Sequence, residues 1–246
     1  MHRVLEAGVA HQVAPGLCAL GIMTKAPLPG SVKTRLQPPL TAAEAAALNV
    51  CFLRDTARAI TEAGPAARGV AVFTPPGSQS TYDGILPPDF PFVPQRGDSF
   101  GERLRNAVSD LLGAGFGACC LIDSDSPTVP AHVFAAAVEA LAHDRVVIGP
   151  SNDGGYYLIG MKRLHAEIFE AIDWSTQRVL AQTLQRANDI QLEVEMLPAF
   201  SDVDDAASLG ALCDELLGTT RNTAPATRAF LEQLIASEGR GRIWPE

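Results

Sequence analysis

Short apolar runs alternate along the chain with longer segments whose apolar residues recur at helical spacing. The runs have the length of β-strands and lie at 17–23, 70–74, 118–123, 145–150, 156–161 and 192–197. They are largely continuous rather than alternately apolar and polar, which is typical of strands that are covered on both faces. The pattern therefore predicts a mostly parallel β-sheet at the centre of the molecule.

The segments between these runs have the signals of α-helices. Helices are predicted at 41–64, 99–115, 130–144, 175–188, 206–217 and 225–237. The first begins with Thr41 and Glu44, which have the spacing of a capping box, and it ends at Gly64. Strands that alternate with helices predict a three-layer α/β/α fold with a doubly wound sheet, whose ligands bind at the carboxyl ends of the strands.

The size and composition suit one domain of this kind. The chain has 246 residues, of which 47% are hydrophobic and 19% charged, so it can bury a full core. We expect a single domain at 17–237, a loose N-terminal extension at 1–16 and a C-terminal tail at 238–246. No apolar run reaches the roughly 20 residues that cross a bilayer, and the extension lacks the apolar stretch of a secretory signal. We therefore expect no membrane span.

Charge and cysteine usage narrow the class of protein further. The formal net charge is -9, which argues against a general nucleic-acid-binding protein, since such proteins usually have a basic face. The five cysteines are Cys18, Cys51, Cys119, Cys120 and Cys213, and no two of them form a C-x-x-C pair. Their apolar surroundings favour reduced, mostly buried thiols in a cytoplasmic protein.

One basic loop contrasts with the negative charge of the whole chain. The sequence KAPLPGSVKTR follows the first predicted strand and contains Lys25, Lys33 and Arg35 but no acid. Pro29 restricts the backbone and Gly30 permits a close approach or a positive φ angle, while an arginine can hold phosphate oxygens bidentately. Neither usual nucleotide pattern, G-x-x-x-x-G-K-[ST] or G-x-G-x-x-G, is present. The stretch indicates either a phosphate-binding loop or a solvated cationic loop.

A pair of acids ends the strand predicted at 118–123. Asp123 and Asp125 are separated by one residue and precede a proline-rich turn. Two carboxylates held together at a strand end favour a bound cation, and Mg²⁺ or Mn²⁺ that bridges to substrate phosphates would neutralise them. Alternatively, one of the two acids caps the helix at 130–144 or shapes the turn, a role that we expect of Asp125 rather than Asp123.

A glycine-containing stretch follows the strand predicted at 145–150. It reads GPSNDGGYYLIG and contains Asn152, Asp153, Gly154, Gly155 and Tyr156. The two glycines allow the main chain to lie against a ligand such as a sugar or an acceptor. Asp-Gly is equally a signal for a hairpin turn, so both interpretations stay open.

A second acidic cluster precedes the helix predicted at 206–217. Asp202, Asp204 and Asp205 lie together there, and acids are favoured at the N-terminus of a helix. They cap this helix, or one of them completes a metal site with Asp125. Trp174, which precedes another predicted helix, is expected to be a packing residue.

Five motifs, taken in order, resemble the bacterial DUF2064 family. They are TKAPLPGSVKTRL, DSDSP, GPSNDGGYYLIG, DWSTQRVLAQTL and LPAFSDVDD, and the similarity extends over roughly residues 17–217. The family is often described as glycosyltransferases associated with radical-SAM or arsenosugar gene clusters. The resemblance implies the GT-A, or nucleotide-diphospho-sugar transferase, fold. Relatives in that superfamily include phospholactate guanylyltransferases and molybdenum-cofactor nucleotidyltransferases.

The resemblance also implies roles for individual residues. The basic loop is similar to the nucleotide-phosphate loop of the superfamily, so Lys25, Pro29, Gly30, Lys33 and Arg35 are its expected contacts with the nucleotide. Asp125 occupies the position of the metal-binding aspartate, and Asp204 that of a late acid which completes metal coordination. This chain departs from the family in having Asp123 where glycine is common, which makes a literal D-x-D glycosyltransferase signature, and Asp205 where threonine is common.

These residues predict a metal-dependent transferase with a nucleotide-activated donor. We expect a nucleoside-diphosphate sugar as donor, Mg²⁺ or Mn²⁺ on Asp125 with Asp123 or Asp204, and a small-molecule acceptor that faces residues 152–156. Lys33 and Arg35 would offset the charge on the leaving phosphate.

The candidate base is Asp153. One alternative is a nucleotidyltransferase that releases pyrophosphate from a nucleoside triphosphate. Another is a catalytically silent nucleotide-binding module, because a fold does not imply an activity.

Overall fold

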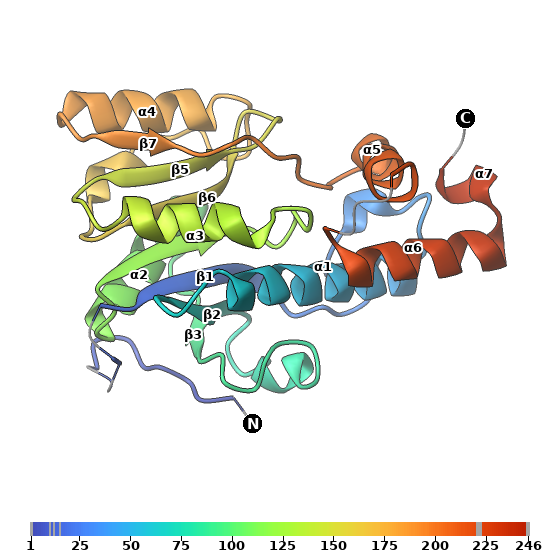
Figure 1. Ribbon diagram of the computed structural model, residues 1–246, viewed down its shortest axis with the longest axis horizontal. Coiled ribbons are helices and arrows are strands. Elements are labelled where there is room, and N and C mark those ends of the chain that lie inside the picture. Colours follow the sequence, from blue (N-terminus) through green and yellow to red (C-terminus); the bar gives the residue numbers. More distant parts are fainter. Residues whose placement is uncertain (1, 10, 12, 15, 220–222, 245–246) are drawn as a thin grey trace.

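A seven-stranded β-sheet runs through the centre of the molecule in the computed structural model (Figure 1). The structure describes residues 2–9, 11, 13, 14, 16–219 and 223–244. The strands are β1 (Cys18–Lys25), β2 (Ala67–Thr74), β3 (Phe92–Pro94), β4 (Ala118–Ile122), β5 (Val146–Pro150), β6 (Tyr156–Met161) and β7 (Val194–Met196). Their order is β3-β2-β1-β4-β6-β5-β7; β6 runs antiparallel to both neighbours, and the other pairs are parallel. The predicted α/β class and mostly parallel sheet are confirmed.

Helices cover both faces of this sheet. They are α1 (Ala42–Glu62), α2 (Phe100–Gly113), α3 (Ala131–Ala140), α4 (Val179–Asp189), α5 (Ala206–Leu217), α6 (Pro225–Glu238) and α7 (Arg240–Ile243), with short 3-10 helices η1 (Thr34–Leu36), η2 (Gln79–Tyr82) and η3 (Ala166–Phe169). One face packs against α1 and α3 through residues such as Leu53 and Phe134. The other packs against α2 and α4 through Val108 and Ala187. The result is the three-layer arrangement of a doubly wound sheet.

The sequence pattern located most elements but not all of their ends. All six predicted strands are present, whereas β3 was not predicted because its three residues are too few to show a period. The helix predicted at 175–188 begins at Val179, since residues 174–178 form turns and a bend. Residues 151–155 connect the antiparallel strands β5 and β6, so the hairpin turn predicted as one interpretation of this stretch is confirmed.

The expectation of a loose N-terminal extension does not hold for its first residues. Val4 forms a β-bridge with Phe92, and the Leu5 amide donates to the Phe92 carbonyl at 2.7 Å. The Leu5 side chain is 3% exposed, and His2 is also buried. These residues therefore lie along β3, where backbone pairing and apolar burial hold them in place.

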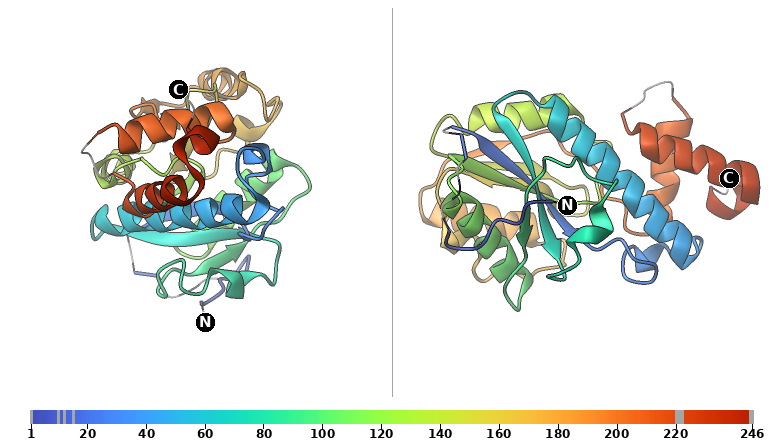
Figure 2. Two further views of the ribbon diagram at one scale, coloured as in Figure 1. Left: turned by 90° about the vertical axis from the view of Figure 1, so that its right-hand side faces the viewer. Right: turned by 90° about the horizontal axis from the view of Figure 1, so that it is seen from below.

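The C-terminal helices form a second core beyond the end of the sheet. Figure 2 shows α5, α6 and α7 against the part of α1 that extends past the strands. Leu48 and Phe52 of α1 pack there with Leu212, Leu231 and Val203. Because Val203 is buried in this core, Asp204, which follows it, is held at the edge of the sheet.

Hydrogen bonds and an ion pair fasten this C-terminal unit to α1. The buried Asp55 carboxylate accepts from the backbone amides of Ala226 and Thr227, at 2.9 and 2.8 Å, and so caps the start of α6. Arg242 of α7 forms an ion pair with Glu44 at 2.6 Å. Part of the segment expected to be a tail is therefore an ordered turn of helix on α1.

Two further findings bear on the class of protein. All five cysteines are free and buried, as the sequence predicts. Among the helices of the described residues, none has the length and apolar character that crossing a membrane requires.

Candidate active site

The basic loop and the acidic turn meet at the carboxyl ends of two neighbouring strands. The loop leaves β1, the turn that carries Asp125 leaves β4, and these strands pair with each other in parallel. This is the edge of a doubly wound sheet at which ligands bind. The stretch before α5 reaches the same place, because the Val203 amide donates to the Asp125 carbonyl at 2.9 Å.

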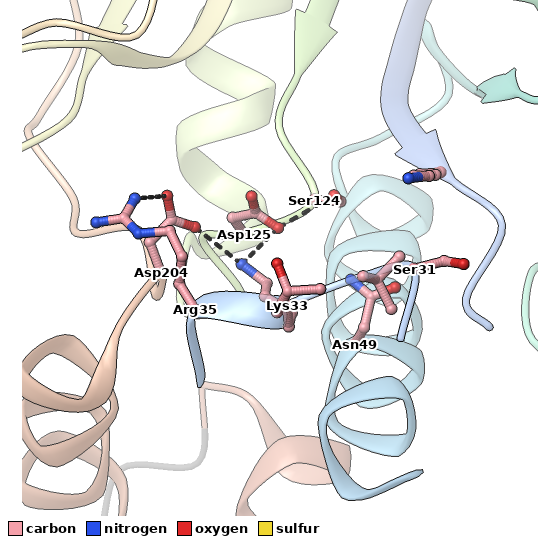
Figure 3. Close-up of a pocket in the computed structure, with 10 residues that line it drawn as sticks. Ser31, Lys33, Arg35, Asn49, Ser124, Asp125 and Asp204 are labelled. Carbon is pink, nitrogen blue, oxygen red and sulfur yellow. Dashed lines mark hydrogen bonds and ion pairs between the residues drawn. The ribbon is translucent and has the colours of Figure 1, made fainter. Parts of the chain in front are cut away.

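Lys33 lies at the centre of this meeting point (Figure 3). Its ammonium group is 2.7 Å from Asp125 Oδ1 and 3.2 Å from Asp204 Oδ1, and it donates to the Val203 carbonyl at 2.6 Å. The side chain is 4% exposed. Burial alone would lower the pKa of this amine, but the two carboxylates outweigh burial and raise it. Lys33 is therefore a charged group that holds two acids from distant parts of the chain together.

A positive φ angle directs the Lys33 side chain inward. The residue has φ 50° and ψ 38°, a left-handed conformation at the start of η1, which is uncommon for a residue other than glycine. Its ammonium also lies 5.4 Å from the centre of the Phe52 ring, a favourable cation–π distance. The contacts of the Lys33 side chain thus offset the backbone strain at this residue.

The other residues of the basic loop differ in their positions. Arg35 is exposed, with Nη1 at 3.3 Å from Asp204 Oδ2 and Nη2 at 3.8 Å from Asp205 Oδ2. Lys25 is exposed at the end of β1. Pro29 and Gly30 are exposed too, and Gly30 has φ +75° with open space where a side chain would lie. The conformational role predicted for Gly30 thus matches its backbone.

These cations surround a cavity of about 250 Å³, which we call the basic cavity. It is lined by Lys25, Ser31, Val32, Lys33, Thr34, Arg35, Asn49, Ser124, Asp125 and Asp204. Three cationic side chains and two hydroxyl-bearing residues of one loop face it, which is a chemistry suited to phosphate oxygens.

Asn49 of α1 also lines the basic cavity, and sequence reasoning missed it. The residue is 3% exposed, and its amide oxygen is covered without a hydrogen-bond partner among the described residues. A buried amide without a partner is costly. The available signal was a polar residue between Leu48 and Phe52 on the apolar side of a helix.

Asp123 is used within its own turn. Its Oδ1 accepts from the backbone amides of Asp125 and Ser126, both at 3.2 Å, and its Oδ2 accepts from Ser126 Oγ at 2.8 Å. Burial, with the nearby Asp125 charge, raises the pKa of Asp123 to about 8. Asp123, and not Asp125 as expected, therefore shapes the turn. A metal-binding role for Asp123 stays a prediction.

Asp125 and Asp204 are the pair that could hold a divalent cation. An oxygen of each carboxylate contacts the Lys33 ammonium. Ser124 Oγ donates to Asp125 Oδ1 at 3.2 Å. Within the described part of the chain, no group of three or more His, Cys, Asp or Glu side chains is arranged to hold a metal. Two carboxylates suit Mg²⁺ that also binds substrate phosphates. The donor set therefore fits a cation that arrives with a phosphorylated ligand.

A larger cavity of about 580 Å³ is also lined by Asp125 and Asp204. It shares Arg35, Ser124, Asp125 and Asp204 with the basic cavity. We call it the aromatic cavity, because Phe100 of α2 and Trp174 form one of its walls. Their rings make an edge-to-face contact with centroids 5.3 Å apart. Trp174 is thus a packing residue, as predicted, which also lines a cavity.

The hairpin turn after β5 contributes Asp153, Gly155 and Tyr156 to the aromatic cavity. Asp153 Oδ1 accepts from the Gly155 amide at 2.8 Å, which shapes the turn. Asn152 is directed elsewhere: its Nδ2 donates to Ser201 Oγ at 2.7 Å. Gly154 has φ +92°, and a Cβ there would be 2.3 Å from the Gln177 carbonyl oxygen, so only glycine fits this position.

The three acids before α5 have different roles: one caps the helix, and two line the cavities. Asp205 caps α5, with Oδ1 accepting from the Ser208 amide at 2.9 Å, which confirms the capping interpretation for this residue. Asp204 points to Lys33 and Arg35. Asp202 lines the aromatic cavity and accepts from Ser151 Oγ at 2.9 Å. Burial raises its pKa, and this hydrogen bond partly opposes the shift.

Comparisons with known proteins agree with this fold. A family model described as an uncharacterized protein conserved in bacteria (DUF2064) matches residues 56–176. A crystal structure from Desulfovibrio desulfuricans G20, provisionally named a nucleotide-diphospho-sugar transferase, is 28% identical with a TM-score of 0.80, over 89% of this chain and 95% of that chain. No curated protein matches the chain in sequence. The predicted resemblance to DUF2064 and the nucleotide-diphospho-sugar transferase fold are confirmed.

More distant solved structures share the fold. A nucleotidyl transferase from Methanothermobacter thermautotroptrophicus is 13% identical with a TM-score of 0.54, over 83% of this chain and 99% of that chain. Rv0371c from Mycobacterium tuberculosis H37Rv, in complex with manganese, is 14% identical with a TM-score of 0.50, over 81% and 98%. At these identities the two structures show that the fold is shared.

Proposed function

We infer that this chain, which is similar to the DUF2064 family over residues 56–176, is a metal-dependent GT-A glycosyltransferase that acts from a nucleoside-diphosphate sugar onto a small acceptor. The observation that carries the proposal is the convergence of Lys33 and Arg35 on Asp125 and Asp204, in the wall between two cavities. A group transfer needs two reactants to meet at one place, and a shared wall provides it.

The basic cavity is the proposed site of the donor diphosphate. Lys25, Lys33 and Arg35 face it and would bind phosphate oxygens by charge-assisted hydrogen bonds. Asp125 and Asp204 would hold Mg²⁺ or Mn²⁺, which supplies charge neutralisation on the diphosphate when bound. The manganese complex of Rv0371c, a protein of the same fold, supports a divalent cation here.

The proposed reaction joins an acceptor hydroxyl to the donor sugar. The acceptor oxygen forms a bond to C1 of the sugar, and the bond from C1 to the phosphate oxygen breaks. Its electron pair leaves with the nucleoside diphosphate, whose added negative charge Lys33 and Arg35 would stabilise; one well-placed donor is typically worth about 3 kcal/mol. The hydroxyl proton passes to a carboxylate of the aromatic cavity. Asp153, whose Oδ1 already accepts from Gly155, is the candidate base through Oδ2.

Nucleotidyl transfer is the second candidate, favoured by the nucleotidyl transferase among the structures of this fold. In that reaction the acceptor oxygen forms a bond to the α-phosphorus of a nucleoside triphosphate, and pyrophosphate leaves. The same cations would then stabilise the pyrophosphate. The two candidates differ in their products, which gives the deciding measurement.

The test incubates purified protein with Mg²⁺ or Mn²⁺ and panels of nucleotide sugars and nucleoside triphosphates, and it quantifies the products. We expect nucleoside diphosphate to be released from one nucleotide sugar. Pyrophosphate released from a triphosphate, without transfer from any nucleotide sugar, would overturn glycosyl transfer and establish the second candidate. A thermal-shift panel run in parallel identifies the base, since specific binding stabilises the folded state.

A further inference from the structure

The aromatic cavity differs in charge from the basic cavity beside it. Its ionisable lining residues are five carboxyl groups and one guanidinium, namely Asp123, Asp125, Asp153, Asp202, Asp204 and Arg35. Asp123 adds little negative charge near neutral pH, because burial raises its pKa to about 8. Arg35 is already paired with Asp204 at 3.3 Å. A reactant that enters this cavity therefore meets a negative field, whereas the basic cavity offers a positive one.

Besides Asp123, two of these carboxylates have no cationic partner. Asp153 and Asp202 take part in no ion pair among the residues that the structure describes, although Asp125 and Asp204 are both paired with Lys33. One oxygen of each is used, since Asp153 Oδ1 accepts from the Gly155 amide and Asp202 Oδ1 from Ser151 Oγ. Their Oδ2 atoms accept from no group of the described chain and can accept from a ligand.

Another part of the lining is aromatic. Phe100 is 45% exposed although it lies in the first turn of α2, and Trp174 packs against its edge. The indole is held close to α2 at Gly101, where a Cβ would be 2.6 Å from Trp174 Nε1. A helix that leaves room for an indole beside an exposed phenyl ring presents a rigid surface to the apolar face of a ligand.

These observations point to one class of acceptor. We propose that the aromatic cavity binds a ring-shaped, hydroxyl-bearing molecule that carries no negative charge. Hydroxyl groups donate to the free oxygens of Asp153 and Asp202, and the C–H face of the ring lies on Phe100 and Trp174. A phosphate or carboxylate on the acceptor would lie beside two unpaired carboxylates, while the guanidinium of Arg35 is already paired with Asp204, which is unfavourable. That the bound molecule is the acceptor rests on the proposed function. The charge of the cavity can be tested independently.

Trp174 is a reporter for this test. The chain has two tryptophans, and Trp244 lies in the C-terminal unit, where its Nε1 donates to Asp214. In a Trp244→Phe protein the emission comes from Trp174 alone. The difference between the natural protein and Trp174→Phe gives the same signal if Trp244→Phe is unstable.

The first measurement compares quenching of Trp174 by caesium and by iodide at equal ionic strength. Each value is scaled to the quenching of a free tryptophan amide. We expect caesium to be more effective by about threefold or more, because a negative cavity concentrates cations. Replacing Asp153→Asn and Asp202→Asn together should bring the ratio towards one, since asparagine keeps the Oδ1 acceptor and removes the charge. Iodide quenching that equals or exceeds caesium quenching would overturn the proposal.

The second measurement uses small probes while Mg²⁺ and inorganic pyrophosphate occupy the basic cavity. Glucose, glucosamine and glucose 6-phosphate are compared by the change in Trp174 emission. Glucose 6-phosphate should bind at least about tenfold more weakly than the other two, and the double variant should reduce this difference. Equal or tighter binding of the phosphorylated sugar would contradict the inference.

Failure of this inference is distinguishable from failure of the proposed function. Transfer of sugar to a phosphorylated acceptor would overturn the acceptor class and leave glycosyl transfer standing. A preserved caesium preference without any release of nucleoside diphosphate would overturn glycosyl transfer and leave the charge of the cavity established.

Discussion

The two cavities at the carboxyl edge of the sheet have opposite chemistry although they share a wall. The basic cavity is formed mainly by one short loop with Lys25, Lys33 and Arg35. The aromatic cavity combines rings from α2 and the 174–178 turns with carboxylates from several strand ends. Asp125 and Asp204 belong to both. Under the proposed function, a charged reactant and an uncharged one would meet at this shared carboxylate pair.

The largest expected effect is that of Asp125→Asn, which removes a carboxylate from the shared wall. Asp125 lies 2.7 Å from Lys33 and is a proposed metal ligand. We expect the metal-dependent part of nucleotide affinity to disappear and turnover to fall by about 100-fold or more. Calorimetric titration with and without Mn²⁺ measures the first effect, and product release measures the second.

Asp144→Asn is the matched control, because Asp144 pairs with Arg163 on the surface before β5. It should leave both quantities unchanged. Unchanged metal dependence in Asp125→Asn would remove this residue from the metal site.

Lys33→Met should separate the two functions of the wall. Since the Lys33 ammonium holds the point where Asp125 and Asp204 converge, free Mn²⁺ must compete with it. We expect the variant to bind Mn²⁺ more tightly than the natural protein without nucleotide, by about tenfold, and to bind nucleotide more weakly. Electron paramagnetic resonance of free Mn²⁺ measures the first effect.

Lys25→Met is the control, because it removes a cation with no ion pair in the described chain. It should weaken nucleotide binding without raising the affinity for Mn²⁺. A Lys33→Met protein whose Mn²⁺ affinity does not rise would refute the competition.

Asn49→Leu should weaken nucleotide binding and stabilise the fold. The covered amide oxygen has no partner in the described residues, and an unsatisfied buried group costs about 1–3 kcal/mol. We expect the variant to have a higher free energy of unfolding than the natural protein, by about 1 kcal/mol, and a weaker affinity for nucleotide. Urea unfolding and nucleotide titration together check this. A loss of stability with unchanged affinity would show that Asn49 serves the packing of α1 instead.

The smallest effect on the basic cavity is expected from Gly101→Ala. A methyl group there would be 2.6 Å from Trp174 Nε1 and 3.0 Å from the Phe169 carbonyl oxygen, so the indole must move, at a cost of about 1–3 kcal/mol. The emission of Trp174 and the binding of uncharged sugars should change, while pyrophosphate affinity stays the same. Gly113→Ala, at the open end of the same helix, is the control and should leave both cavities unchanged. If Gly101→Ala weakened pyrophosphate binding as much as sugar binding, the cavities would not be independent.

The fold could be predicted from the sequence because its signals are local. Buried strands, the Thr41 capping box and the Asp-Gly turn each lie within a few residues, and all three are present. β3 was missed because it is short and takes its conformation from pairing with β2. The packed position of Val4 and Leu5 likewise depends on contacts with a strand almost ninety residues away.

The candidate site was predictable only in part. The residues at strand ends were found, because carboxyl edges of parallel strands place Lys33 and Asp125 together. The contact between Lys33 and Asp204 spans 171 residues and was not predicted. The sequence offered one acid of the 202–205 cluster for a metal site with Asp125, and the family resemblance singled out Asp204. No local pattern predicts which partner each of these polar side chains has. Asp123 accepts from its own turn, Asn152 donates to Ser201, and Asn49 lines the basic cavity from a helix.

The most direct test of the account is a crystal structure with Mn²⁺ and inorganic pyrophosphate, in which anomalous scattering locates the metal. The account predicts Mn²⁺ at the Asp125–Asp204 pair and pyrophosphate in the basic cavity, within hydrogen-bonding distance of Lys33. Mn²⁺ bound away from this pair, or pyrophosphate bound against Phe100 and Trp174, would contradict it.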